Sequence, residues 1–226
     1  MKLTNQQIEI IDQTLVLNGL IYEDIKLEIT DHIASEIEVE MNEKKIPFEE
    51  ALILVFENWS MQLKRTKYGF LLGRQYSGPK IIMDKTASYV KSRLLYILLG
   101  SIPLTGLSFL IIYGTHPEAM KIIFTNSVRI IYLLEVFFVV VSWILIVQSK
   151  AKTTYSYLFK KRSLLVFVQP LFIGIGLMPL TSLFKGSIAM QLTLIYTFIA
   201  LALFFLLDFS LVINHLKLVR KYKIYP

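Results

Sequence analysis

The chain has 226 residues, a formal net charge of +7 and a hydrophobic share of 54%. Soluble domains have an apolar share of roughly 45–50%, so the composition excludes a purely soluble protein and favours membrane helices joined to a small soluble domain. The chain contains no cysteine, which excludes disulfide bonds, cysteine-bound zinc and thiol catalysis. The residues from Met1 to Gln7 are polar, so no cleavable signal peptide is expected.

The charges are divided unevenly along the chain. Residues 1–60 carry 13 acids and four bases, a net charge of −9, whereas residues 61–226 carry 20 bases and four acids, a net charge of +16. An acidic head is therefore followed by a basic, apolar body. The basic excess is interpreted as a determinant of membrane topology rather than of ligand binding.

Residues 1–63 are predicted to form a small cytoplasmic domain of three helices. Thr4 with Gln7 three residues later is typical of a capping box at a helix start. Proline disfavours a helical conformation in the residue before it, so Pro47 separates the second helix from the third. We expect the first helix between Thr4 and Asn18, the second at about Tyr22 to Asn42, and a third that carries the apolar residues from Phe48 to Trp59.

The candidate functional residues of this domain lie on its second and third helices. Glu28, His32 and Glu36 recur every four positions beside Asp31, which places an imidazole between carboxylates on one helix surface. This set is a weak metal candidate, because a zinc site requires three or four converging ligands. A hydrogen-bonded histidine on a solvated face is favoured, and neither a metal nor a cofactor is expected. Asp31, His32, Glu36 and Trp59 are instead candidates for binding a partner protein.

Three short segments carry a family resemblance: Asp31-His32-Ile33, Ser35-Glu36-Ile37-Glu38, and Pro47-Phe48-Glu49-Glu50-Ala51 leading to Trp59. With the order of the helices, they resemble the HTH-associated α-helical signalling domains and the permease-prefix domains. The resemblance covers residues 1–63, and Lys44-Lys45-Ile46 stand where that family usually has a glycine. It implies a head ahead of bacterial membrane spans, coupled to a separate PadR-type transcription regulator. No direct binding of nucleic acid is expected, because no helix-turn-helix domain is evident in the sequence.

Residues 64–93 are expected to form a basic juxtamembrane linker. Aromatic residues such as Tyr68 and Phe70 alternate there with bases, a mixture that suits either RNA or an anionic lipid surface. Lipid is favoured because the adjacent apolar run places this segment at the membrane surface. From about Lys80 a helix is expected to continue into the first span.

The rest of the chain is dominated by long apolar runs. Each is long enough to cross a hydrocarbon core of about 30 Å, and only a helix satisfies its own backbone hydrogen bonds there. The predicted fold class is all-α, a three-helix cytoplasmic domain followed by a four-helix transmembrane bundle and a basic cytoplasmic tail at 214–226. The four spans are predicted at about 94–113, 130–147, 164–184 and 188–213.

The bases flanking these runs indicate the topology. Seventeen lie at 64–93, 150–162 and 217–223, whereas the alternate connections hold only Lys121, Arg129 and Lys185. The positive-inside rule then places both termini of this multi-pass protein in the cytoplasm. The resemblance implies that the membrane is the bacterial inner (plasma) membrane.

Two acids interrupt the apolar spans, Glu135 and Asp208. An ionised acid at mid-membrane costs about 2.5–3.5 kcal/mol, so such residues are functional candidates. Their positions within the runs place them in opposite leaflets, too far apart to form one pair. Glu135 is expected to pair with Lys185, and Asp208 with the inner-loop bases or with Asn214 and His215. The alternatives are interfacial acids satisfied by lysine or water, or a proton or cation path.

Prolines and glycines are also placed within the spans. Pro103, Pro170 and Pro179 are expected to kink their helices, and Gly174 and Gly176 to permit close helix packing.

No nucleophile–base pair, phosphate-binding glycine loop or paired carboxylates stand out, so an enzyme is not expected. The primary hypothesis is a polytopic integral membrane protein whose cytoplasmic head binds another protein in signalling or regulation. The alternative is a small oligomeric transporter or permease subunit that uses the intramembrane acids. A third hypothesis is a structural or lipid-organising membrane protein.

Overall fold

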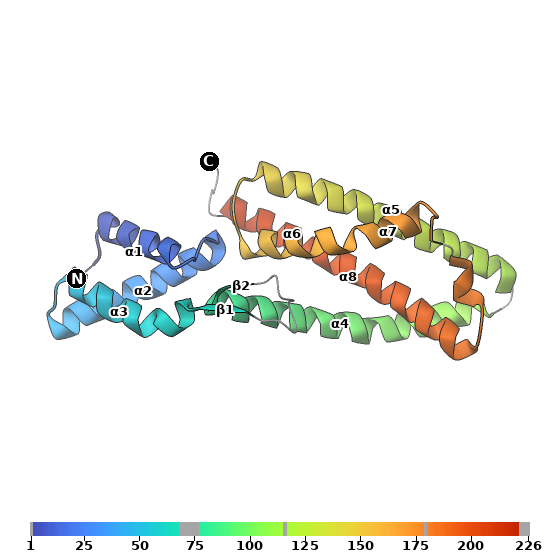
Figure 1. Ribbon diagram of the computed structural model, residues 1–226, viewed down its shortest axis with the longest axis horizontal. Coiled ribbons are helices and arrows are strands. Elements are labelled where there is room, and N and C mark those ends of the chain that lie inside the picture. Colours follow the sequence, from blue (N-terminus) through green and yellow to red (C-terminus); the bar gives the residue numbers. More distant parts are fainter. Residues whose placement is uncertain (1, 68–76, 115–116, 179, 222–226) are drawn as a thin grey trace. The chain divides into compact units, whose positions relative to one another are not determined.

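The computed structural model describes residues 2–67, 77–114, 117–178 and 180–221, and these are almost entirely helical, as predicted (Figure 1). Contacts between Cα atoms divide the chain into two units. The head unit comprises Met1–Lys91 and Ala151–Thr154, and the bundle unit comprises Ser92–Lys150 and Tyr155–Pro226.

The head unit contains the three predicted N-terminal helices, α1 (Asn5–Leu17), α2 (Glu23–Lys44) and α3 (Phe48–Leu63). The capping box is confirmed, because the Gln7 backbone N–H donates to the Thr4 hydroxyl at 3.3 Å and the Thr4 N–H donates to Oε1 of Gln7 at 2.8 Å. Helix α2 packs against both α1 and α3. The apolar faces of the three helices form a core that includes Ile11, Leu15, Ile25, Ile29, Ile33, Ile37, Ala51 and Val55.

The turn between α2 and α3 has an unusual backbone conformation. Lys45 follows the last residue of α2 with φ of 57°, in the left-handed region that glycine adopts most easily. Pro47 then precedes α3 in an extended conformation with φ of −69°. A lysine therefore occupies a backbone conformation that favours glycine.

A short antiparallel ribbon follows α3. It pairs β1 (Arg65–Lys67) with β2 (Ser77–Pro79), and Thr66 lies opposite Gly78. Helix α4 (Lys80–Ile112) begins directly after β2, which confirms the helix predicted from about Lys80 into the first apolar run. Tyr68 and Phe70, on which the interpretation of the linker partly rests, lie outside the described residues.

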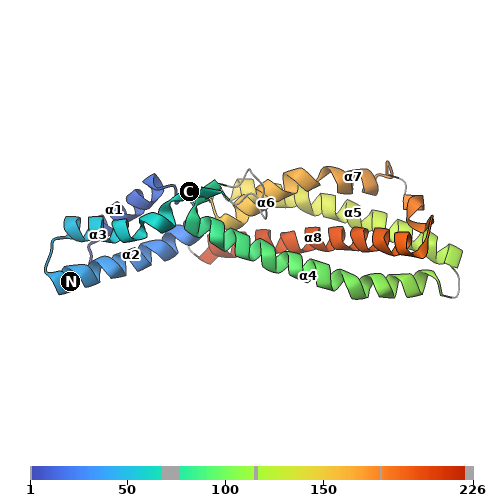
Figure 2. The ribbon, with the colours of Figure 1, turned by 60° about the horizontal axis from the view of Figure 1, so that its bottom comes forward.

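The bundle unit contains α5 (Pro117–Gln148), α6 (Thr154–Val166), α7 (Val168–Gly174), the 3-10 helix η1 (Leu180–Phe184) and α8 (Ile188–Lys221), with the second part of α4. Helix α5 contacts α7, η1 and α8, and these elements lie side by side in Figure 2. Within the described residues, three helices are long and apolar enough to cross a membrane, namely α4, α5 and α8. These helices indicate a multi-pass membrane protein.

The prediction of a fourth continuous span at 164–184 was wrong, because this stretch is divided among α6, α7 and η1. Pro170 lacks a backbone N–H, and its ring clashes with the carbonyl four residues earlier. That carbonyl belongs to Val166, the last residue of α6. Gly176, with φ of 81°, lies in the turn after α7 and prevents a further extension. Pro103, by contrast, lies inside an uninterrupted α4.

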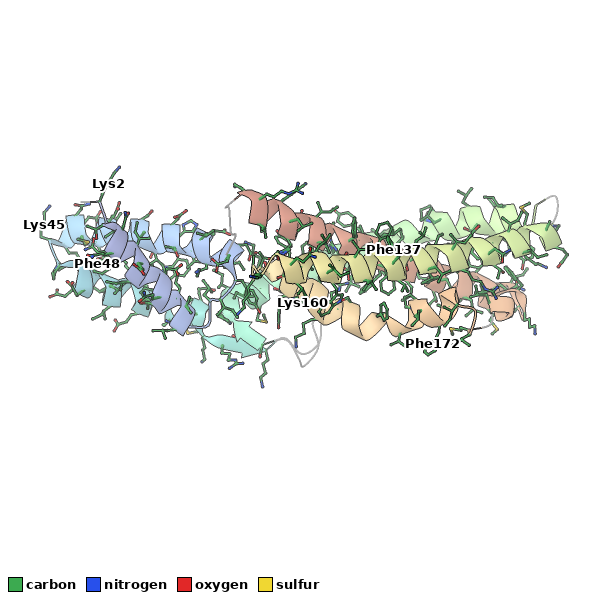
Figure 3. The ribbon with its side chains drawn as sticks, turned by 90° about the horizontal axis from the view of Figure 1, so that it is seen from above. Lys2, Lys45, Phe48, Phe137, Lys160 and Phe172 are labelled. Carbon is green, nitrogen blue, oxygen red and sulfur yellow. The ribbon has the colours of Figure 1, made fainter. Side chains whose placement is uncertain are left out.

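Helix α7 approaches α5 closely at Gly174, as the small-residue pattern predicted. A Cβ atom at Gly174 would lie 2.8 Å from Cδ2 of Leu133, so there is no room for a side chain. Around this contact Tyr132, Ile173 and Phe205 belong to one buried cluster. The outer faces are apolar and exposed instead: Phe172 is 44% exposed and projects from α7 in Figure 3. Exposed apolar surface of this extent is suited to contact with lipid.

Candidate functional site

Glu135, on α5, is 4% exposed, and neither of its carboxylate oxygens has a hydrogen-bond partner among the described residues. The predicted pairing with Lys185 was therefore wrong. The apolar run was expected to begin at Ile130, but α5 begins at Pro117, about 27 Å along the helix axis from Glu135 at 1.5 Å per residue. Glu135 is thus well inside the helix rather than near its end.

Asp208, on α8, is held in a buried ion-pair cluster. Its Oδ1 accepts from Nη1 of Arg93 at 3.3 Å, and its Oδ2 accepts from Nε of Arg162 at 3.2 Å. Arg93 also donates from Nη2 to the Ser210 hydroxyl, and the guanidinium of Arg162 lies 4.2 Å from the centre of the Phe204 ring. The prediction that inner-loop bases meet Asp208 is confirmed for Arg162, whereas Arg93 was not anticipated.

The two acids line the same cavity, whose volume is about 210 Å³. The expectation that Glu135 and Asp208 lie in opposite leaflets was wrong. It relied on the ends of the apolar runs, but α5 and α8 both extend well beyond those runs. Each acid lies 13 residues before the last residue of its helix, Gln148 in α5 and Lys221 in α8. The rest of the cavity wall is mostly apolar and aromatic: Phe138, Val139, Ser142, Phe159, Ser163, Phe205, Leu206 and Phe209.

Two hydroxyls also contribute to this wall. Ser142 is 1% exposed and its Oγ has no hydrogen-bond partner in the described part of the chain. The Ser163 hydroxyl accepts from Nε1 of Trp143 at 2.9 Å. Ser142 lies seven residues after Glu135, which places both on one face of α5. Sequence reasoning missed Ser142, although this spacing could have indicated it.

Among the candidate residues of the head, Glu28, Glu36 and Trp59 form hydrogen bonds with other side chains. Nζ of Lys85 donates to Glu28 at 2.8 Å, and this hydrogen bond lowers the pKa of the Glu28 carboxyl against a smaller opposing effect of burial. Nε1 of Trp59 donates to Oε2 of Glu36 at 2.9 Å, whereas Asp31 and His32 are exposed. No group of three or more His, Asp or Glu residues in the described ranges is arranged to hold a metal ion.

Sequence reasoning also missed three hydrogen bonds that join α2 to the connection after α5. The backbone N–H of Glu23, the first residue of α2, donates to the Lys152 carbonyl at 2.8 Å. In return, Asp24 accepts from the Thr154 backbone N–H at 2.8 Å and from the Thr154 hydroxyl. Thr154 is the first residue of α6, so two helix starts satisfy each other's unpaired N–H groups. These residues are 130 positions apart, and no local pattern could have revealed the contact.

We compared the chain with protein-family models, curated proteins and solved structures, and none of them matches.

Proposed function

We propose that this chain is a multi-pass membrane protein whose N-terminal helices bind another protein in a signalling or regulatory role, and that it is not an enzyme. The observation that carries the proposal is the set of three hydrogen bonds between the first turn of α2 and residues 152–154. Residues 151–154 belong to the head unit, and in the chain they join α5 to α6.

The same helix offers a surface to a partner. Asp31 and His32 are exposed on α2, and Glu36 is exposed beside Trp59, to which it is hydrogen-bonded. A partner that binds this surface holds the helix that also contacts Thr154. A partner bound to this surface therefore also acts on the segment that joins α5 to α6. This coupling gives the head a regulatory role rather than a purely anchoring one.

The charge of the head favours a basic partner. Residues 1–60 have a net charge of −9, which repels an anionic lipid surface and attracts a cationic protein surface. Domains that bind nucleic acid are commonly basic, so a PadR-type regulator, as implied by the resemblance, has a suitable charge.

The hydrogen bonds between Asp24 and Thr154 also bear on the orientation. They require the head and the α5–α6 connection to lie on one side of the membrane, which agrees with the distribution of bases. We propose that this side is the cytoplasm and that the membrane is the bacterial inner membrane, with both termini inside. This topology requires α6, α7 and η1 together to return the chain across the membrane between α5 and α8. The native chain has no cysteine, so Glu43→Cys and Glu118→Cys provide single labelling sites. An impermeant thiol reagent added to intact cells should label the variant at 118 and spare the variant at 43; the reverse result excludes this orientation.

The partner is tested by crosslinking and copurification of the full chain. A double variant, Asp31→Lys with Trp59→Ala, changes the proposed surface, and Glu9→Lys on α1 is the matched charge reversal elsewhere on the head. A protein recovered with the wild type and with Glu9→Lys, but at least about tenfold depleted with the double variant, supports the proposal. If the three preparations recover the same proteins in equal amounts, a partner-binding role for this surface is excluded.

A second candidate function is transport. It is favoured by the finding that Glu135 and Asp208 line one cavity. Three membrane-crossing helices are few for a transporter, so this function would require oligomers. Reconstituted vesicles should then show a proton or cation flux that Glu135→Gln abolishes, and absence of flux in wild-type vesicles excludes this candidate.

A further inference from the structure

We propose that the cavity lined by Glu135 binds a small lipophilic amine, with the ammonium group on the Glu135 carboxylate and the apolar body among Phe138, Phe205 and Phe209. This proposal concerns a ligand of the bundle unit and does not depend on the head. It rests on three observations: the acceptors without a hydrogen-bond partner in the cavity wall, the charges of that wall, and the volume of the cavity.

The wall contains buried acceptors that the protein itself does not satisfy. Glu135 and Ser142 are only 4% and 1% exposed. Nevertheless, both carboxylate oxygens of Glu135 and the Oγ of Ser142 lack a hydrogen-bond partner in the described ranges. A buried acceptor without a donor loses the free energy of its hydrogen bonds to water. A ligand with an N–H donor restores those hydrogen bonds, and an ammonium group carries up to three of them.

The charges of the wall select a cation. Glu135 and Asp208 are the charged side chains among the described residues that line the cavity, and both are acids. The guanidinium groups of Arg93 and Arg162 are bonded to Asp208 and are not part of this wall. Their positive charges offset that of Asp208, so an anionic ligand would face the carboxylate of Glu135, which has no partner among the described residues. A lipid acyl chain would fill the space but leave Glu135 without a donor.

The size of the cavity limits the ligand to about one ring. A cavity of about 150 Å³ holds benzene, and drug-sized ligands occupy about 300–1,000 Å³. The cavity of about 210 Å³ thus suits a single aromatic ring with a short amine chain. The rings of Phe138, Phe205 and Phe209 offer apolar contact and cation–π attraction to such a molecule.

The ligand reaches this cavity from the lipid. Leu206 and Phe138 belong to the wall and are 54% and 42% exposed on the apolar outside of the bundle unit. A molecule dissolved in the hydrocarbon therefore has access from the side. A phospholipid headgroup amine is excluded by depth, because Glu135 lies about 20 Å along the axis from the end of α5 at Gln148.

The first experiment compares three small ligands on the full chain in detergent, with Trp59→Phe as the only substitution. The chain contains two tryptophans, so Trp59→Phe leaves Trp143 as the sole reporter, and its indole is bonded to Ser163 in the cavity wall. Phenethylamine is compared with propylbenzene, its neutral isostere, and with 3-phenylpropionate, an anion. The amine should quench or shift Trp143 fluorescence saturably and bind at least about tenfold more tightly than the other two. Equal affinities for amine and hydrocarbon, tighter binding of the anion, or no saturable binding overturn the proposal.

A matched pair of variants then identifies the carboxylate. Glu135→Gln removes the charge at nearly constant volume, and Glu118→Gln makes the same change at the exposed start of the same helix. Phenethylamine affinity should fall at least about tenfold in the first and stay unchanged in the second. Unchanged affinity in Glu135→Gln overturns the proposal. If Glu135→Gln does not fold, the relative affinities of the three ligands for the Trp59→Phe chain decide whether the proposal holds. Asp31→Lys in the head should leave amine binding unaltered, so this test is independent of partner binding.

Discussion

Arg162 donates from Nε to Oδ2 of Asp208 at 3.2 Å, and the two side chains are only 9% and 7% exposed. Arg93 completes the cluster from α4, so a single carboxylate on α8 joins two other helices of the bundle unit. Charges buried in this way lose their hydration, and their mutual attraction must offset that loss. The cluster is therefore sensitive to the removal of one member.

Asp208→Asn should destabilise the bundle unit by about 3–5 kcal/mol, because it removes the carboxylate charge that both buried guanidinium groups contact. The triple variant Arg93→Met, Arg162→Met, Asp208→Leu removes all three charges and should be less destabilised than the single variant. Chemical unfolding in detergent, followed by circular dichroism, measures both. Equal stability of wild type and Asp208→Asn would show that the ion pairs contribute nothing.

Gly174→Ala should destabilise the contact between α7 and α5 by about 1–3 kcal/mol, because the added Cβ would lie 2.8 Å from Cδ2 of Leu133. Gly106→Ala on α4 is the control, since no atom lies within 4 Å of the Cβ that it adds. This control should be neutral or slightly stabilising, as alanine favours helix more than glycine does. Thermal unfolding distinguishes the two, and the same loss in both would contradict the close approach.

Lys45→Gly should stabilise the head unit by up to about 1 kcal/mol. A lysine at φ of 57° has a steric cost that glycine lacks, and this gain exceeds the extra entropy of the unfolded glycine chain. Glu43→Gly, two residues earlier within α2, should have the opposite effect and destabilise by about 1 kcal/mol. Unfolding of the full chain, monitored by Trp59 fluorescence in a Trp143→Phe background, gives both signs.

Asp24→Ala should destabilise the attachment of residues 151–154 by about 1–2 kcal/mol, since it removes both acceptors of Thr154. Hydrogen exchange of the Thr154 amide should become about tenfold or more faster. Asp31→Ala changes an exposed acid of the same helix and should leave this amide protected. Unchanged protection in Asp24→Ala would mean that the hydrogen bond does not form in solution.

The ion pair between Glu28 and Lys85 should give the head unit a small dependence of stability on pH. The hydrogen bond from Lys85 lowers the pKa of Glu28 below its ordinary 4.5 in the folded state. Its contribution is therefore complete above 4.5 and is lost as the pH falls through the folded pKa. The side chains are 47% and 56% exposed, so the effect should stay below about 1 kcal/mol.

Lys85→Met should remove this component from a denaturant titration between about pH 6 and about pH 3. The acid-side loss of stability should then be smaller than in the wild type. An identical pH profile in both proteins would contradict the ion pair.

Local patterns predicted the local structure well. Thr4 and Gln7 placed the start of α1, and the apolar stripes placed the three helices of the head, because these signals act within one or two turns. Pro170 was expected only to kink a helix, but the helix is interrupted before it. Hydropathy records that residues 164–184 are apolar, and it does not record the helical hydrogen bond that proline removes. The depth of Glu135 was misjudged for a related reason: the helix extends beyond its apolar run to Pro117.

The sequence by itself determined the solvent of this protein, its helical class and the acidic character of its head, because composition and short-range periodicity carry that information. Only the tertiary structure decided that Asp208 meets Arg93, that Glu135 remains unpartnered in the same cavity, and that Asp24 holds Thr154. These contacts join residues as many as 130 positions apart, and they depend on how whole helices pack rather than on any local preference.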